Sequence, residues 1–160
     1  MKVRELMTSN PAVCDLNASV SEAARKMWDS DCGVLPVLKD GREVVGLLTD
    51  RDICMALVIN DCKASDVSAE KIISGQVYSV TPEDEIQTAL ALMQENKVRR
   101  LPVITDEGDL KGMVSMNDVV LRAEEVAGKK PPAITYADVV NTFKSICLHP
   151  VPLQQKASAG

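Results

Sequence analysis

The pattern of hydrophobic and polar positions occurs twice along the chain. When the sequence is shifted against itself by 66 residues, residues 7–54 align with residues 73–120 without a gap. Replacements keep their physical type, as at Leu47/Met113. The eight identities are Ala23/Ala89, Met27/Met93, Leu35/Leu101, Pro36/Pro102, Val37/Val103, Asp40/Asp106, Gly46/Gly112 and Asp52/Asp118. Self-similarity at a fixed offset predicts two copies of one supersecondary unit.

Each copy predicts the same order of elements. In the first copy, Ser19 and Glu22 have the spacing of a capping box, and apolar residues follow at helical spacing to about Asp29. A hairpin and a closing helix are then predicted, over residues 34–38, 44–48 and 50–57. The second copy predicts a helix, two strands and a helix, over residues 84–94, 101–104, 110–114 and 117–125.

One such copy has too few strands and helices to close a core alone. The two copies are therefore expected to face each other, strand surface to strand surface, about a pseudo-twofold axis. The expected class is α+β (α/β-like), with two β-α-β-β-α repeats and a C-terminal helix at about 136–147 that packs on its own domain or on another chain. The expected divisions are a first repeat at 1–60, a linker at 61–68, a second repeat at 69–127 and an extension with a frayed end at 128–160.

Composition and charge exclude several classes of protein. Hydrophobic residues at 46% and charged residues at 26% are typical of globular domains. A net charge of -5 opposes binding to a nucleic-acid backbone. The longest apolar run, Ile53 to Ile59, is too short to span a membrane, and the first residues lack the apolar region of a signal peptide. We therefore expect a cytoplasmic protein that binds neither nucleic acid nor membrane.

Cysteine and histidine usage argues against metal and covalent chemistry. The five cysteines show no C-x-x-C spacing, and the only histidine, His149, lies beside Pro150. Neither a zinc site nor a nucleophile paired with histidine can be assembled from this set. We expect reduced thiols, no metal, no cofactor and no enzymatic activity.

The same short motif follows the second predicted strand of each copy. It consists of a glycine, two apolar residues, a hydroxyl (Thr49 or Ser115), two variable residues and an aspartate (Asp52 or Asp118). Hydroxyl-x-x-acid is also the pattern of a helix capping box, and that alternative stays open. A hydroxyl at a helix N-terminus can donate to phosphate, and an aspartate can accept from vicinal ribose hydroxyls. The glycine would let a flat base approach the backbone. Together these groups predict a nucleoside-phosphate site.

Two such motifs, each preceded by Leu-Pro-Val, resemble a pair of cystathionine-β-synthase-type (CBS) domains, often called a Bateman module, over about residues 1–127. The resemblance implies a stand-alone regulatory module that binds AMP, ADP or ATP between the repeats, forms a disk-like homodimer and acts on an unidentified regulated protein. Alternatives are a sensor of S-adenosylmethionine or NAD, or an adaptor in which the motifs only cap helices. In this resemblance Thr49 and Ser115 contact phosphate, Asp52 and Asp118 the ribose, and Thr81 the base or phosphate region.

The two copies differ where charge would matter. Lys97, Arg99 and Arg100 stand where the first copy has Asp31, Gly33 and Val34, and arginines suit phosphate. Lys97 and Arg99 are alternatively a solvated surface. The variable motif positions also differ, so the further candidate residues are Asp50, Arg51 and Asn117. We expect two inequivalent sites.

Overall fold

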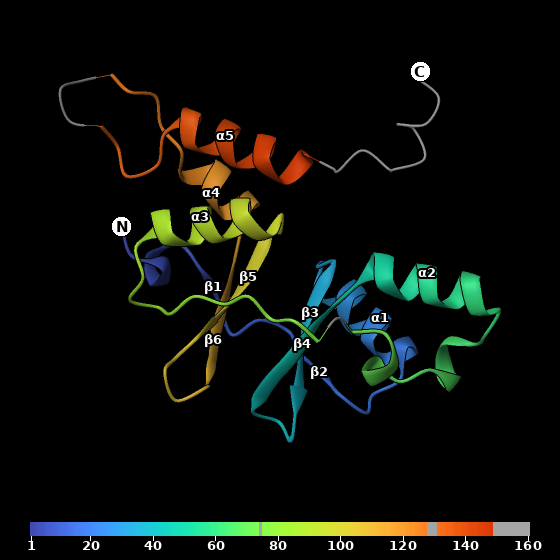
Figure 1. Ribbon diagram of the computed structural model, residues 1–160. Helices are drawn as coiled ribbons and strands as arrows, with labels where there is room; N and C mark the ends of the chain where they lie inside the picture. The colour runs from blue at the N-terminus through green and yellow to red at the C-terminus, as the bar shows by residue number, and fades with distance from the viewer. Residues whose placement is uncertain (74, 128–130, 149–160) are drawn as a thin grey trace, which may run out of the picture.

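The computed structural model describes residues 1–73, 75–127 and 131–148 and has a mixed α+β fold with two three-stranded sheets (Figure 1). Repeat 1 consists of β2 (Cys14–Asp15), α1 (Val20–Asp29), β3 (Val34–Lys39), β4 (Glu43–Thr49) and α2 (Asp50–Asn60). Repeat 2 consists of α3 (Ile86–Asn96), β5 (Arg100–Ile104), β6 (Leu110–Ser115) and α4 (Met116–Arg122), and α5 (Tyr136–Cys147) follows it. The predicted fold class is confirmed. The frayed end and His149 lie outside the described residues.

The pseudo-symmetry extends to the register of the strands. In the antiparallel hairpin of repeat 1, Leu35 lies opposite Leu48, and in repeat 2 Leu101 lies opposite Val114. The register shifts directly after Val37 in one hairpin and after Val103 in the other, which are positions 66 residues apart. The two copies are therefore structural as well as sequence repeats.

The predicted bounds of both helices in repeat 2 differ from those observed, Ile86–Asn96 and Met116–Arg122, and two of the differences have a local cause. α3 begins at Ile86 rather than at residue 84, because Thr81 and Asp84 form a turn of their own: the Thr81 N–H donates to Asp84 Oδ2 at 2.7 Å. α4 ends at Arg122 rather than at residue 125, because the backbone N–H of Glu124 donates to the carbonyl of Ile134 at 3.0 Å. A parallel bridge to the segment before α5 thus replaces the last turn of the helix.

Each repeat is completed by the segment that leads into the other repeat. The 3₁₀ helix η1 (Val3–Glu5) places Val3 in the core of repeat 2, and β1 (Thr8–Ser9) pairs antiparallel with β6. The 3₁₀ helix η3 (Ala69–Lys71) places Ala69 in the core of repeat 1. Figure 1 shows the N-terminal segment beside α3, and the segment after α2 returns beside α1. The chain therefore has two separate cores rather than the shared core expected from the sequence.

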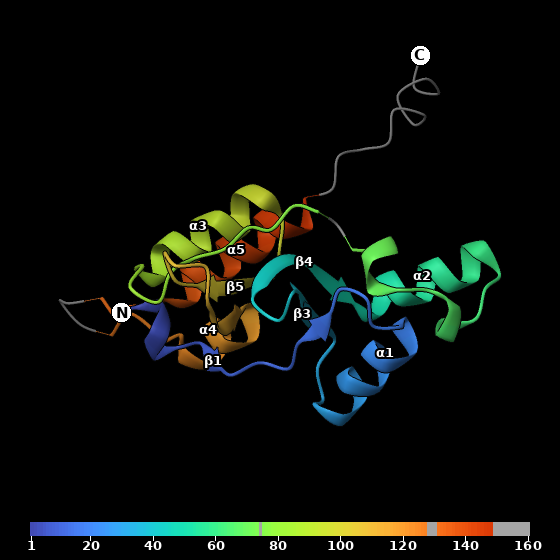
Figure 2. The same cartoon turned by 90° about the horizontal axis from the view of Figure 1, so that it is seen from below.

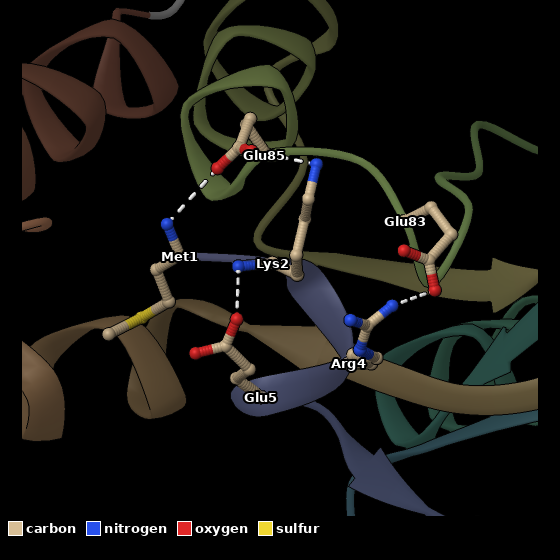
Figure 3. Close-up of polar contacts among 6 residues, drawn as sticks. All are labelled: Met1, Lys2, Arg4, Glu5, Glu83 and Glu85. Atoms are coloured by element: carbon tan, nitrogen blue, oxygen red, sulfur yellow. Dashed lines mark hydrogen bonds and ion pairs between the residues drawn. The ribbon is translucent and has the colours of Figure 1, made fainter.

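Ion pairs attach the N-terminus to the start of α3 (Figure 3). The amino group of Met1 lies 3.1 Å from Glu85 Oε2, and Lys2 Nζ lies 2.7 Å from Glu85 Oε1. Arg4 pairs with Glu83. Hydrogen bonds from Lys2 and the terminal amino group lower the pKa of the Glu85 carboxyl below its ordinary value. These exposed contacts orient η1, while the burial of Val3 stabilises it.

The helix α5 packs on repeat 2 of its own chain. It lies over α3 and also contacts α4, as Figure 2 shows from below. Thr142 is fully buried, and its Oγ1 accepts a hydrogen bond from Gln94 Nε2 at 2.8 Å. Ile134 and Ile146 join the core of repeat 2. None of the described helices is both long and apolar enough to cross a membrane.

Candidate functional site

Both sequence motifs form capping boxes. The Thr49 N–H and Oγ1 donate to Asp52 Oδ2 at 3.0 and 2.6 Å, and the Asp52 N–H donates back to Thr49 Oγ1 at 3.1 Å. The Ser115 N–H and Oγ donate to Asp118 Oδ2 at 2.8 and 2.6 Å. Among the described residues, none donates to Oδ1 of either aspartate. Each carboxylate therefore caps its helix with one oxygen and retains a second oxygen that can accept from a ligand.

The second motif lines a cleft between the repeats, hereafter the Asp118 cleft. Its volume is about 490 Å³, within the range of small-molecule sites. Ser115, Asn117 and Asp118 form one wall. The other walls come mainly from residues before β2 and after α1, together with Arg100: Thr8, Asn10, Pro11, Ala12, Ser30, Asp31, Cys32, Gly33 and Val34. The cleft therefore combines residues from both halves of the chain.

The pseudo-symmetric counterpart of this cleft is smaller. A pocket of about 240 Å³ is lined by Leu47, Gln76, Tyr78, Val98 and Arg100. A shift of 66 residues relates all five to residues of the Asp118 cleft, with Tyr78 in place of Ala12 and Arg100 in place of Val34. Because both replacements are larger, they fill space that is open on the other side. Thr49 and Asp52 do not line this pocket.

Arg100 stands at the junction of the two pockets. It is half-buried on β5 and lines the Asp118 cleft, its smaller counterpart and a third hollow of about 160 Å³. That third hollow also includes Arg99, Asn117 and Phe143 of α5. Among the residues that line the Asp118 cleft or its smaller counterpart, Arg100 is the one cationic side chain.

The remaining sequence candidates lie elsewhere. Asp50 lines a hollow between α1 and α2, and its Oδ1 accepts from the Arg51 N–H at 2.7 Å. Arg51 is exposed, and Thr81 belongs to the turn before α3. Neither Arg51 nor Thr81 lines the Asp118 cleft or its counterpart. Of the ten candidates, the Asp118 cleft brings together four: Arg100, Ser115, Asn117 and Asp118.

The glycine of the second motif has a structural reason that differs from the expected one. A Cβ atom on Gly112 would lie 2.8 Å from Met7 Sδ and 2.8 Å from the carbonyl oxygen of Thr8. The glycine therefore makes room for β1, which pairs with β6, and the approach of a base to Gly112 stays a prediction.

Sequence reasoning missed the walls that face the second motif. Asn10, Pro11 and Ala12 follow β1, and residues 31–34 connect α1 to β3. Residues 31–34 are the first-copy counterparts of residues 97–100, which were singled out for their charge. About a pseudo-twofold axis, a segment of one repeat faces the motif of the other repeat. The 66-residue alignment of residues 31–34 with residues 97–100 could therefore have pointed to residues 31–34 as a wall of the site.

Comparison with known proteins then decides the family. The model of the CBS domain matches residues 3–59 and again residues 66–125. The chain belongs to the CBS domain family. CBS pairs are regulatory ligand-binding modules, and the two matched copies make this chain one such pair.

Several relatives share most of this CBS pair. The protein YlbB of Bacillus subtilis is 33% identical over 144 residues, which cover 86% of this chain and 93% of YlbB. The crystal structure of Hypoxic Response Protein I with two coordinated zinc ions is 28% identical, with a TM-score of 0.70, and covers 78% of this chain and 100% of that chain. In this chain, the described residues contain no group of three or more His, Cys, Asp or Glu side chains that could hold a metal.

A third comparison concerns the fold. The CBS domain pair of protein MJ0100, solved in complex with 5′-methylthioadenosine and S-adenosyl-L-methionine, is 23% identical with a TM-score of 0.68. The match covers 76% of this chain and 98% of that chain. At this identity the likeness shows the shared fold.

Proposed function

We propose that this CBS pair is a non-catalytic regulatory module that binds one adenosyl ligand per chain in the Asp118 cleft. The observation that carries the proposal is the convergence of Ser115, Asn117, Asp118 and Arg100 on a cleft walled by the other half of the chain. The MJ0100 pair supports it, because a protein of the same fold accommodates adenosyl ligands.

The chemistry of the cleft matches the parts of a nucleotide. In this proposal Asp118 Oδ1 accepts from ribose hydroxyls while Oδ2 holds the cap. Arg100 supplies a positive charge for phosphate. Because Asp31 and Asp118 also line the cleft, further phosphates would meet carboxylates without a matching cation. Among AMP, ADP and ATP we therefore favour AMP.

A second candidate ligand is S-adenosylmethionine. Asp31 favours it, since a carboxylate beside the cleft would attract the positive charges of that ligand. NAD stays an alternative with no residue of its own to recommend it. A purely structural adaptor, in which both motifs are only caps, is the competing function.

The regulatory step would act through the elements that the cleft joins. A ligand can shift a conformational equilibrium only if it contacts two arrangements differently. Arg100 and Asn117 line both the cleft and the hollow that includes Phe143 of α5. We therefore propose that the ligand changes the relative position of the repeats or the seating of α5, and that a cytoplasmic homodimer presents this change to a regulated protein.

Isothermal titration with AMP, ATP and S-adenosylmethionine tests the proposal on a matched pair of variants. Asp118→Ala and Asp52→Ala each remove a cap, so each should lower stability by about 0.5–2 kcal/mol. The parent and Asp52→Ala should bind AMP equally well, with one site per chain, and Asp118→Ala should bind at least about 10-fold more weakly. If none of the three ligands binds the parent, or if both variants bind as the parent does, the adaptor function is favoured. Loss of binding in Asp52→Ala alone would move the site to the other cleft.

A further inference from the structure

Few polar contacts join the two repeats directly. Their hydrophobic cores are separate, and no strand of one repeat pairs with a strand of the other among the described residues. In the part of the chain that the structure describes, the hydrogen bonds and ion pairs between the elements at 14–60 and those at 86–122 all come from one side chain, Arg42. Arg42 is therefore the polar side chain on which the relative position of the repeats most depends.

Arg42 joins the tips of the two hairpins. It lies in the turn between β3 and β4, and both hairpins end on the lower side of the molecule in Figure 1. Its Nε donates to Asp109 Oδ1 at 3.1 Å, and its Nη2 donates to the carbonyl oxygen of Glu107 at 3.3 Å. Two hydrogen bonds from one planar guanidinium fix direction as well as distance. We call these contacts of Arg42 with Asp109 and Glu107 the Arg42 clasp.

The pseudo-symmetry would allow a second clasp, but the sequence does not provide one. Under the 66-residue shift, Arg42 corresponds to Gly108, and Asp109 corresponds to Glu43. Gly108 has no side chain that could reach Glu43, and its φ of +89° lies in the region that favours glycine. The clasp is therefore single and breaks the pseudo-symmetry, as the Asp118 cleft does.

A hollow beside the clasp shares a wall with the Asp118 cleft. Its volume is about 390 Å³, and Arg42 and Asp109 help to line it. Asn10 and Pro11 line both this hollow and the Asp118 cleft. The Asn10 N–H donates to the Lys111 carbonyl oxygen at 3.4 Å, and Lys111 Nζ lies 3.6 Å from Asp109 Oδ2. Two contacts thus connect the clasp to a wall of the ligand cleft.

We propose that Arg42 is a positioning residue for the Asp118 cleft: the Arg42 clasp holds the two repeats in the arrangement that binds the adenosyl ligand. The inference rests on the proposed function and deepens it, because it names a contact outside the cleft that regulates binding in the cleft. When the binding-competent arrangement is only partly populated, the apparent dissociation constant rises in proportion. Arg42 is 68% exposed and Asp109 is 42% exposed, so the clasp contributes no more than an ordinary surface ion pair, and its loss should change the affinity by less than 10-fold, roughly.

Isothermal titration with AMP on a double-mutant cycle tests the proposal. Arg42→Met and Asp109→Asn each remove one half of the ion pair at an exposed position, so both proteins should fold. Each should bind AMP about 2- to 5-fold more weakly than the parent, and the double variant should lose no more affinity than Arg42→Met alone. Glu43→Gln is the matched control, since Glu43 is equivalent to Asp109 but outside the clasp, and it should bind as the parent does.

Two outcomes of this cycle would overturn the proposal. One is a double variant whose loss of affinity is the product of the two single losses, because the two side chains would then act independently. The other is parent-like affinity in both single variants. Arg42→Lys keeps the positive charge and should retain most of the affinity that Arg42→Met loses.

Salt and ligand give readouts that a merely structural role would not move. In about 1 M salt, where the Debye length is about 3 Å, the ratio of the affinities of the parent and Asp109→Asn should approach one. By linkage, AMP strengthens the clasp by the factor by which the clasp strengthens AMP binding. Solvent exchange of the Arg42 Nε–H, followed by NMR, should therefore slow by about 2- to 5-fold when AMP is added to the parent. An exchange rate that AMP leaves unchanged would contradict the coupling.

The same titrations separate this proposal from the proposed function. Neither Arg42 nor Asp109 lines the Asp118 cleft. A parent that binds no adenosyl ligand would refute both proposals. A parent that binds AMP, with loss of binding in Asp118→Ala but unchanged binding in Arg42→Met and Asp109→Asn, would refute the positioning role of Arg42 alone.

Discussion

Replacing Leu6 by alanine should destabilise repeat 2, although Leu6 precedes repeat 1 in the chain. Leu6 is 8% exposed and belongs to the same core as Ile86, Val103 and Val114. A buried Leu→Ala substitution costs about 2–5 kcal/mol, and because η1 is a short terminal segment that can partly relax, we expect about 2–3 kcal/mol. For a chain of this size, that loss corresponds to a melting temperature lower by roughly 4–12 °C.

Hydrogen exchange followed by mass spectrometry locates the loss. Because the two cores are separate, amides of β5 and β6 should lose more protection in Leu6→Ala than amides of β3 and β4. The matched control is Ile72→Ala, 66 residues later, which packs on the core of repeat 1 and should give the opposite distribution. If Leu6→Ala lowers the exchange protection of β3 and β4 as much as that of β5 and β6, the segment before repeat 1 does not stabilise repeat 2 in particular, and the reasoning is refuted.

Two further predictions concern the polar contacts of repeat 2. Glu85→Gln should destabilise the protein near neutral pH, because the lowered pKa of the Glu85 carboxyl stabilises the folded state only at pH values where that carboxyl is ionised. The difference in unfolding free energy from the parent should shrink as the pH falls below 4.5 and vanish below the lowered pKa of Glu85. Urea unfolding at a series of pH values measures this difference, and a difference that grows in acid contradicts the prediction. Thr142→Val should lower the free energy of unfolding by about 1–2 kcal/mol, because it leaves the Gln94 amide without its hydrogen-bond partner. Adding Gln94→Leu should recover much of that stability. Equal instability of the single and double variants in urea would show that this hydrogen bond is not the cause.

The local elements could be predicted from the sequence because local residues determine them. Capping boxes at Ser19, Thr49 and Thr135 begin α1, α2 and α5 where the sequence places them. The tail helix spans Tyr136–Cys147 as predicted. The packing of each leading segment on the other repeat could not be predicted. A repeat alignment shows that Val3 and Ala69 are equivalent but does not show which core each one enters.

The candidate site also has a part that could be predicted from local sequence and a part that could not. Ser115 and Asp118 are visible as a motif, because they stand three positions apart, within one helix turn. The facing wall at residues 10–12 and 31–34 depends on the relative position of the repeats, which no short motif encodes. Thr49 and Asp52 show the limit of motif reasoning: they form the same capping box as Ser115 and Asp118, but they do not line the smaller pocket, to which Tyr78 and Arg100 belong.

The two repeats share one fold but differ in their pockets and in what packs on their helices. Ser115 and Asp118 of repeat 2 line the larger cleft, and α5 packs on the helices of that repeat, whereas Thr49 and Asp52 of repeat 1 line neither pocket. Asp31, Cys32 and Gly33 line both the Asp118 cleft and the hollow beside Trp28. A ligand that displaces these three residues therefore also reshapes the hollow beside Trp28.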